Sequence, residues 1–241
     1  HALENIGHTG PVLLTLGDKY IEPEAVQVLL EGFIRQQADL ALLTVPWNPT
    51  GEASSGRVLL GQDGQALCII ERLDIARQAI VDELRRRLGR RQKLAGTVIH
   101  ELAARQIDNP KKLAVAVPEL LELTKRPMID RQQLEKILDR NHYNLTVSGH
   151  CLTAMEIEKT CKQFNPSLYL FTAEAFYRGV AMIDNHNAQR EYYLPDVVRH
   201  LSGQTDPDGL PRYRVRTVPA NDPDLIQGFN SPEELLVIQD Y

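Results

Sequence analysis

The stretch Pro11-Val-Leu-Leu-Thr-Leu-Gly17-Asp18 is a continuous apolar run that ends on a glycine and a carboxylate. Such a run is typical of a strand buried on both faces of a parallel sheet, and ligands gather at the carboxyl ends of these strands. Asp18 follows a glycine that lets the backbone turn closely, and its carboxylate suits a hard divalent cation. The alternative is that Asp18 only caps a helix beginning near Glu22. This stretch alone leaves both interpretations open.

A helix and a second apolar strand are expected next. The segment 22–37 has Pro23 in its first turn and apolar residues spaced for one buried face. These residues are Ala25, Leu29, Leu30 and Phe33. The run Leu40–Val45 then reads as a strand, so the order strand, helix, strand predicts a βαβ unit with a right-handed crossover and a parallel sheet.

A breaker-rich loop and a hairpin are predicted beyond this unit. Residues 46–56 are dense in Pro, Gly and Ser and contain the single Trp, so this loop either covers a ligand or is a plain surface connection. Residues 57–71 read as two short strands around an Asp63-Gly64 turn. Glu71 therefore ends a strand, as Asp18 does.

The composition changes over residues 73–160, which are rich in Leu, Arg, Lys, Glu and Gln. Helical periodicity is present over 75–88, 94–106, 113–124 and 130–138, and it is broken by Gly89, Pro110, Pro118 and Pro127. We expect a small helical subdomain inserted into an α/β body formed by residues 1–72 and 161–241. The basic run Arg85-Arg86-Arg87 either grips phosphate or an acidic partner, or is a solvated helix face beside Asp82 and Glu83.

The α/β pattern returns near the C-terminal side. We predict strands over 166–171 and 213–218 and helices over 173–183 and 197–201. Thr172 is expected to start the first of these helices. A last helix is expected to begin with Ser231 as N-cap and Pro232 at its first position.

Composition bounds the class of protein. The chain has 241 residues and a net charge of −5, which argues against a nucleic-acid binder with a broad basic face. It contains neither an apolar run near the ~20 residues of a membrane span nor an opening signal peptide. Cys68, Cys151 and Cys161 form no metal-binding or redox motif and are expected to be reduced, buried thiols. We expect a cytoplasmic protein without nucleic-acid or membrane partners.

Six short fragments carry a resemblance when they are taken in chain order. They are Leu16-Gly-Asp18, Pro49-Thr-Gly with Gly56-Arg-Val, Ile70-Glu71, Asn165 before a strand, Asn187-Ala-Gln-x-Glu-Tyr-Tyr-Leu-x-Asp196, and Gly228-x-Asn230. Together they resemble the sugar-phosphate nucleotidyltransferases, most closely the uridyltransferase domain of the bifunctional N-acetylglucosamine-1-phosphate uridyltransferases. The resemblance covers residues 2–71 and 161–236.

The resemblance implies a fold and an activity. The fold is the α/β, Rossmann-like nucleotidyltransferase (nucleotide-diphospho-sugar transferase) fold with a helical insertion. It would be incomplete at the N-terminus, because His1-Ala2 is similar to the tail of a segment that follows the family's Gly-rich nucleotide loop. The activity is Mg²⁺-dependent transfer of a nucleotidyl group from a nucleoside triphosphate, with UTP as the expected donor. The acceptor would be a sugar-1-phosphate such as N-acetylglucosamine-1-phosphate, and pyrophosphate would leave.

The resemblance also implies residue roles. Asp18 and Asn230 match the family's catalytic metal ligands, and both offer the oxygen atoms that Mg²⁺ prefers. Gly56, Glu71 and Asn165 match residues that hold the sugar. Lys19 stands where the family has apolar residues, and it either meets phosphate or is solvated.

One departure from the family pattern concerns Pro166-Ser167, which replaces a small residue and a Gly. This change removes an N–H group and adds bulk near the acyl group of the sugar. It bears on the identity of the sugar more than on the type of reaction.

Two other functions remain open. The chain could be a non-catalytic, nucleotidyltransferase-like module that docks a partner, or forms a homo-oligomer, through residues 73–160. Alternatively, the helical insert alone could be the functional part.

Overall fold

The computed structural model describes residues 7–46, 56–142, 145–147, 150–185, 191–229 and 231–239. Two compact units are present. The first contains the described residues up to Ile70, from Cys161 to Asp184 and from Tyr192 onward, and the second contains Glu71–Thr160 with Asn185 and Glu191. Each unit has its own apolar core.

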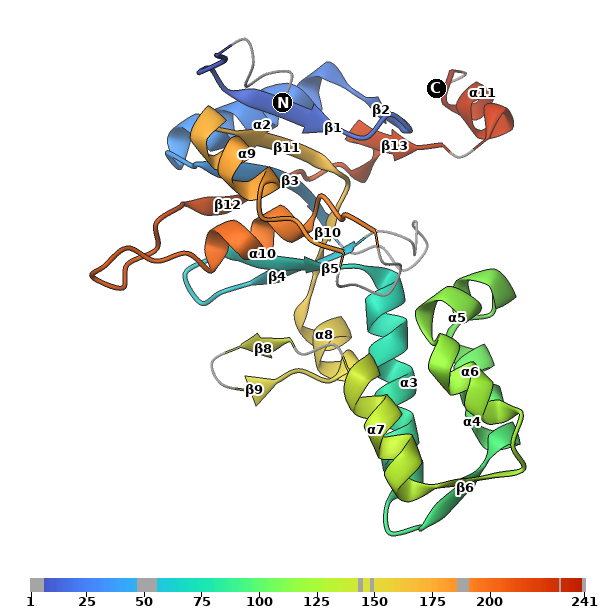
Figure 1. The fold of residues 1–241 in the computed structure, drawn as a ribbon. Coiled ribbons are helices and arrows are strands. Elements are labelled where there is room, and N and C mark those ends of the chain that lie inside the picture. The colour runs from blue at the N-terminus through green and yellow to red at the C-terminus, as the bar shows by residue number, and fades with distance from the viewer. Residues whose placement is uncertain are drawn as a thin grey trace. The chain divides into compact units, whose positions relative to one another are not determined.

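The first unit is built on a seven-stranded sheet with the order β1-β11-β3-β10-β4-β5, and β12 also pairs with β3 (Figure 1). The strands are β1 (Val12–Thr15), β3 (Leu40–Pro46), β4 (Gly56–Leu60), β5 (Ala66–Ile70), β10 (Gln163–Asn165), β11 (Leu168–Phe171) and β12 (Val215–Pro219). The predicted hairpin is confirmed, because β4 and β5 pair around a turn in which Gly64 has a φ of +75°.

The predicted parallel sheet is wrong. Strand β11 lies between β1 and β3 and pairs antiparallel with both, so β1 and β3 run in the same direction without being neighbours. Among the described strands, only β12 pairs parallel, with β3. Strand β1 is therefore at the edge of the sheet and is not buried on both faces, and Leu13 is 47% exposed.

Helices cover both faces of this sheet. Because side chains alternate along a strand, Ala41 and Leu43 of β3 pack with helix α2 (Pro23–Arg35) on one face. Leu40 and Leu42 point to the other face, towards α9 (Ala173–Val180) and α10 (Asp196–Ser202). The predicted Thr172 cap is confirmed, because its hydroxyl accepts a hydrogen bond from the Ala175 amide over 3.3 Å.

Helix α2 matches its prediction with one exception. Ala25 and Leu29 are fully buried, but Leu30, which was expected in the buried face, is 44% exposed. The close packing of α2 on the sheet depends on Gly32, because a β-carbon there would overlap the side chain of Val218 on β12.

A small ribbon of β2 (Lys19–Ile21) and β13 (Ile226–Gly228) joins the first part of the chain to its last part. The 3₁₀ turn η1 (Pro223–Leu225) precedes β13, and helix α11 (Pro232–Gln239) follows it. The Ser231 hydroxyl accepts from the Glu234 amide over 3.2 Å, which confirms the predicted N-cap.

The second unit consists mainly of helices. They are α3 (Arg72–Leu88), α4 (Gly96–Gln106), α5 (Pro110–Ala116), α6 (Pro118–Thr124), α7 (Arg131–Asn141) and α8 (Ala154–Thr160). Short strand pairs join them, β6 (Lys93–Ala95) with β7 (Met128–Asp130) and β8 (Thr146–Val147) with β9 (His150–Cys151). The break predicted at Pro118 is confirmed, because α5 ends at Ala116 and α6 begins at Pro118, which has no backbone donor and suits the first position of a helix. None of the described helices has the length and apolarity needed to cross a membrane.

Candidate functional site

Asp18 lies in the turn between β1 and β2, and it is exposed. It does not cap a helix, because β2 separates it from α2, which begins at Pro23 with Glu22 in the N-cap position. Of the two interpretations that the sequence leaves open, helix capping is therefore excluded. The carboxylate stands just beyond the carboxyl end of β1.

The backbone of Asp18 is bonded to the C-terminal part of the chain. In the β2–β13 ribbon, Lys19 lies opposite Gly228, and the Phe229 amide donates a hydrogen bond to the Asp18 carbonyl over 3.0 Å. Asn230, the second predicted metal ligand, lies outside the described residues. Its neighbour Phe229 is nevertheless held against Asp18.

Two of the predicted sugar-binding residues face each other. Gly56 of β4 and Asn165 of β10 are register partners at the end of their ladder, and both are buried. The Asn165 amide nitrogen donates to the Tyr169 hydroxyl over 2.6 Å, and its carbonyl oxygen accepts from the Ser167 amide over 3.0 Å. These two bonds hold the side chain of Asn165 in one orientation.

These two groups of residues lie at the same end of the sheet. Thr15, the last residue of β1, pairs with Leu168, the first residue of β11. Asp18 follows Thr15 by three positions, and Asn165 precedes Leu168 by three. The carboxyl end of β1 and the junction between β10 and β11 are therefore adjacent, as expected for a ligand site at a sheet end.

Ser167 keeps the backbone conformation that a glycine would adopt. Its φ of +69° lies in the left-handed region, which residues with a β-carbon rarely occupy. In this conformation the Ser167 amide donates its hydrogen bond to the Asn165 side chain.

Glu71 directly follows Ile70, the last residue of β5, and it is half-buried. It occupies the N-cap position of α3 without a side-chain cap hydrogen bond, and it is the first residue of the second unit. Lys19 lies in β2 and is half-buried. The loop with the single Trp and most of the Asn187–Tyr193 block lie outside the described residues.

Sequence reasoning missed two residues beside Asn165. Tyr169, which is 1% exposed, supplies the acceptor for the Asn165 amide. Arg57, which is 3% exposed, places its guanidinium 4.5 Å from the centroid of the Phe164 ring. Tyr169 lies in no quoted motif, whereas Arg57 belongs to the Gly56-Arg-Val fragment, and its place directly after Gly56 is a signal that could have been followed.

The exposed carboxylate of Asp18 is a ligand type that Mg²⁺ accepts. Within the described part of the chain, no cluster of three or more His, Cys, Asp or Glu side chains is arranged around a common point. Mg²⁺ commonly keeps several waters and takes only one or two carboxylates together with substrate phosphates. An exposed carboxylate at Asp18, beside the backbone that leads into Asn230, fits that pattern.

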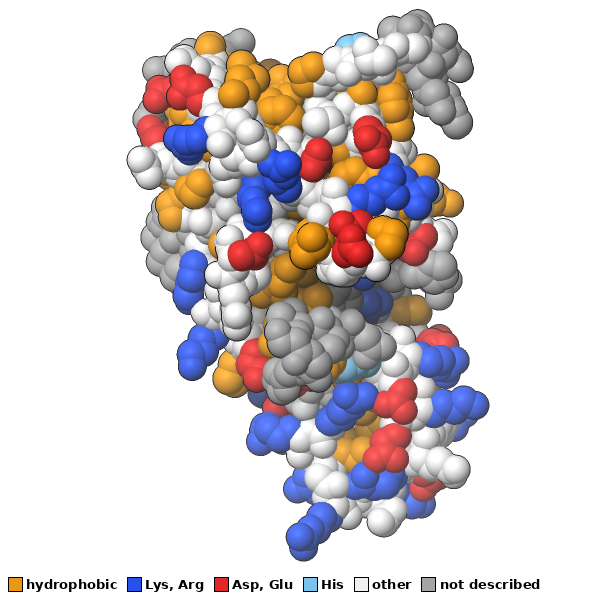
Figure 2. Space-filling view, turned by 90° about the vertical axis from the view of Figure 1, so that its left-hand side faces the viewer, with side chains coloured by type: hydrophobic (Ala, Val, Ile, Leu, Met, Phe, Trp, Pro, Cys, Tyr) orange, Lys and Arg blue, Asp and Glu red, His pale blue; other side chains and the backbone are white. Residues whose placement is uncertain are grey.

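The basic run of the second unit is largely ion-paired. Glu83 accepts from Arg86 and Arg87, with distances of 2.5 and 3.0 Å, and Arg85 pairs with Asp139 over 2.8 Å. Figure 2 shows Lys and Arg side chains interspersed with Asp and Glu over the lower part of the view. These pairs support the interpretation as a solvated helix face.

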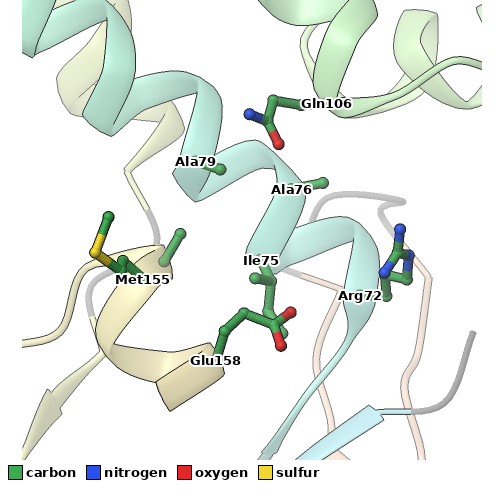
Figure 3. Close-up of a pocket in the computed structure, with 8 residues that line it drawn as sticks. Arg72, Ile75, Ala76, Ala79, Gln106, Met155 and Glu158 are labelled. Atoms are coloured by element: carbon green, nitrogen blue, oxygen red, sulfur yellow. The ribbon is translucent and has the colours of Figure 1, made fainter. Parts of the chain in front are cut away.

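The second unit also contains an open cavity of about 270 Å³ between α3, α4 and α8 (Figure 3). Residues of all three helices line it: Arg72, Ile75, Ala76 and Ala79 from α3, Gln106 from α4, and Ala154, Met155 and Glu158 from α8. Met155 is 80% exposed, which is unusual for a large apolar side chain.

The cysteines differ in burial. Cys68 and Cys161 are buried, as predicted, whereas Cys151 is half-exposed and its sulfur lies 3.8 Å from Nε2 of His142. Burial raises the pKa of the Cys68 thiol to about 12.

Comparison with known proteins shows similarity over part of the chain. No protein-family model matches it. The bifunctional protein GlmU of Bacillus cytotoxicus is 43% identical over 51 residues, which is 21% of this chain and 11% of the relative. GlmU of Caldicellulosiruptor saccharolyticus is 31% identical over 86 residues, which is 36% of this chain and 17% of the relative. The matched stretches span less than a fifth of either relative.

Proposed function

We propose that this chain carries the sugar-binding and metal-binding part of a sugar-1-phosphate nucleotidyltransferase. The reaction transfers a nucleotidyl group from a nucleoside triphosphate, UTP in the first instance, to N-acetylglucosamine-1-phosphate or a similar sugar-1-phosphate. Pyrophosphate is the second product. The observation that carries the proposal is the placement of Asp18 and the Gly56–Asn165 pair at one end of the sheet. The partial similarity to GlmU proteins supports it.

In this proposal the residues divide into two groups. Asp18 and Asn230 hold Mg²⁺, which supplies charge neutralisation at the phosphates when it is bound. The Gly56 amide, the Asn165 side-chain amide and the Glu71 carboxylate bind the sugar. Lys19, which is half-buried in β2 directly after Asp18, is a separate candidate for phosphate binding.

The chemistry needs little beyond this placement. Phosphoryl-type transfer depends mainly on holding the attacking oxygen in line with the phosphorus atom and on neutralising charge. Asn165 is suited to positioning the sugar-1-phosphate, because its two hydrogen bonds fix its orientation before the sugar binds. The loss of side-chain entropy when the sugar binds is therefore smaller.

Calorimetry of UDP-N-acetylglucosamine binding, with and without Mg²⁺, tests the proposal. We expect Mg²⁺-dependent binding that Asp18→Ala weakens at least tenfold. Asp208→Ala, at another exposed aspartate of the first unit, is the matched control. Equal affinity of the Asp18→Ala variant and the unmodified chain, with a native unfolding transition in both, would refute the metal role.

A second candidate function is a docking module that binds a partner through the second unit. The exposed Met155 beside the α3–α4–α8 cavity favours it. Met155→Asp would then abolish partner binding while UDP-N-acetylglucosamine binding stayed unchanged. If a partner recovered with the unmodified chain bound this variant equally well, this candidate would be discarded.

A further inference from the structure

A buried cation lies next to the Gly56–Asn165 pair. Arg57 is 3% exposed, and its guanidinium stands over the ring of Phe164 at 4.5 Å from the centroid. Phe164 is itself only 6% exposed. Arg57 and Phe164 are register partners across β4 and β10, so the contact is a cross-strand pair.

This pair occupies the middle position of a short ladder. Strands β4 and β10 pair at three positions, Val58 with Gln163, Arg57 with Phe164 and Gly56 with Asn165. The last position therefore has a neighbour on one side only, and that neighbour is the Arg57–Phe164 pair. The Arg57–Phe164 pair is thus one position away from Gly56 and Asn165 on the same two strands.

Burying the charge of an arginine at this position is unfavourable by itself. Removing a charged group from water is unfavourable unless partners replace the lost hydration, and an apolar side chain would fill a buried strand position without that cost. The neighbouring Val58 and Leu59 show that this strand otherwise buries apolar residues. The guanidinium provides a directional contact, because the face of a desolvated aromatic ring attracts a cation.

We infer that Arg57 is a positioning residue for the sugar side of the site and acts through Phe164. The Arg57–Phe164 contact fixes the separation between the Gly56 amide and the Asn165 side chain, and so determines how well a sugar fits between them. This inference rests on the proposed function, since it assigns a role to the sugar-binding pair. It adds a residue that does not itself touch the ligand.

Substitutions at both partners test the inference. Arg57→Met keeps the length of the side chain and removes the charge, and Phe164→Leu keeps an apolar side chain and removes the ring. We expect each to weaken UDP-N-acetylglucosamine binding about tenfold while keeping a cooperative unfolding transition in urea. The double variant should bind no more weakly than either single variant, because both remove the same contact. Arg57→Lys, which keeps a cation, should restore part of the loss.

The chain offers a matched control. Arg212 lies over the ring of Tyr213 at 5.5 Å, so Arg212→Met removes the same kind of contact elsewhere in the first unit. We expect this variant to bind UDP-N-acetylglucosamine as the unmodified chain does. Loss of the cooperative unfolding transition in Arg57→Met would show a general folding defect and overturn the inference, as would unchanged binding of UDP-N-acetylglucosamine.

A second measurement separates this inference from the proposed function. The Asn165 side-chain amide donates to Tyr169, so its NMR resonance reports its orientation without any ligand. We expect Arg57→Met, but not Arg212→Met, to shift it. If the unmodified chain binds no sugar nucleotide, the proposed function fails. If the Asn165 resonance is also unmoved in Arg57→Met, the positioning role fails independently.

Discussion

The backbone amide of Phe229 donates a hydrogen bond to the carbonyl oxygen of Asp18 over 3.0 Å. This bond extends the β2–β13 ribbon by one position and joins segments from opposite ends of the sequence. The bond holds Phe229, the residue before Asn230 in the sequence, beside Asp18. The ribbon thus supports the proposal that these two residues share a metal ion.

Removing this donor should weaken metal-dependent binding. Phe229→Pro lacks the backbone N–H, and we expect about tenfold weaker binding of UDP-N-acetylglucosamine in the presence of Mg²⁺, measured by calorimetry. Phe229→Ala keeps the N–H and loses only the side chain, so it serves as the control. If the two variants bind equally well, the hydrogen bond has no part in placing Asn230.

Replacing Ser167 by glycine should stabilise the folded protein. Its φ of +69° is unfavourable for a residue with a β-carbon, and the gain from Ser167→Gly is partly offset by the greater freedom of glycine in the unfolded chain. We expect a net increase of about 0.5–1 kcal/mol in the free energy of unfolding, measured with urea. Ser167→Ala retains the β-carbon and should not show this gain. A glycine variant no more stable than the alanine variant would contradict the argument.

Glu83 should make stability depend on pH. Its hydrogen bonds from Arg86 and Arg87 lower its pKa from 4.5 to about 2. A carboxylate whose pKa is lower in the folded state stabilises the protein above its unfolded pKa, and this contribution is lost as pH falls from 4.5 towards 2. Because Arg86 is 69% and Arg87 43% exposed, solvent screening limits the effect to about 0.5–1 kcal/mol.

The variant Glu83→Gln should therefore be less stable than the unmodified chain at pH 7, and the difference should shrink below pH 4.5 and in high salt. Urea unfolding across this pH range gives the comparison. Glu101→Gln, on the exposed part of α4, should show no such trend. A difference that persisted unchanged at pH 2 would mean that Glu83 acts by some means other than its charge.

Thiol labelling should distinguish the three cysteines. In the folded protein, Ellman's reagent should modify only Cys151, because Cys68 and Cys161 are buried and burial raises the pKa of the Cys68 thiol to about 12. Unfolding in urea should make all three reactive. Cys151→Ser should leave the folded chain unreactive, and rapid labelling of that variant would show that the core opens.

Local signals in the sequence were sufficient to predict many turns, caps and strands. The Asp63-Gly64 turn, the Thr172 and Ser231 caps and the proline at the start of α2 each depend on residues a few positions apart. Such signals act before any long-range contact forms. The apolar run at Pro11–Asp18 likewise identified a strand, with a carboxylate just beyond its end.

Only the tertiary structure decided which strands are neighbours. The alternation of side chains that marks a strand does not name its partner, so nothing in the run from Val12 to Thr15 indicated that β11 would lie between it and β3. The same holds for the pairing of Gly56 with Asn165, the bond between Asp18 and Phe229, and the stacking of Arg57 on Phe164. The sequence alone thus determined the residue types and local turns of the candidate site. The long-range pairing of strands, which depends on the free energy of the whole sheet, brought those residues together.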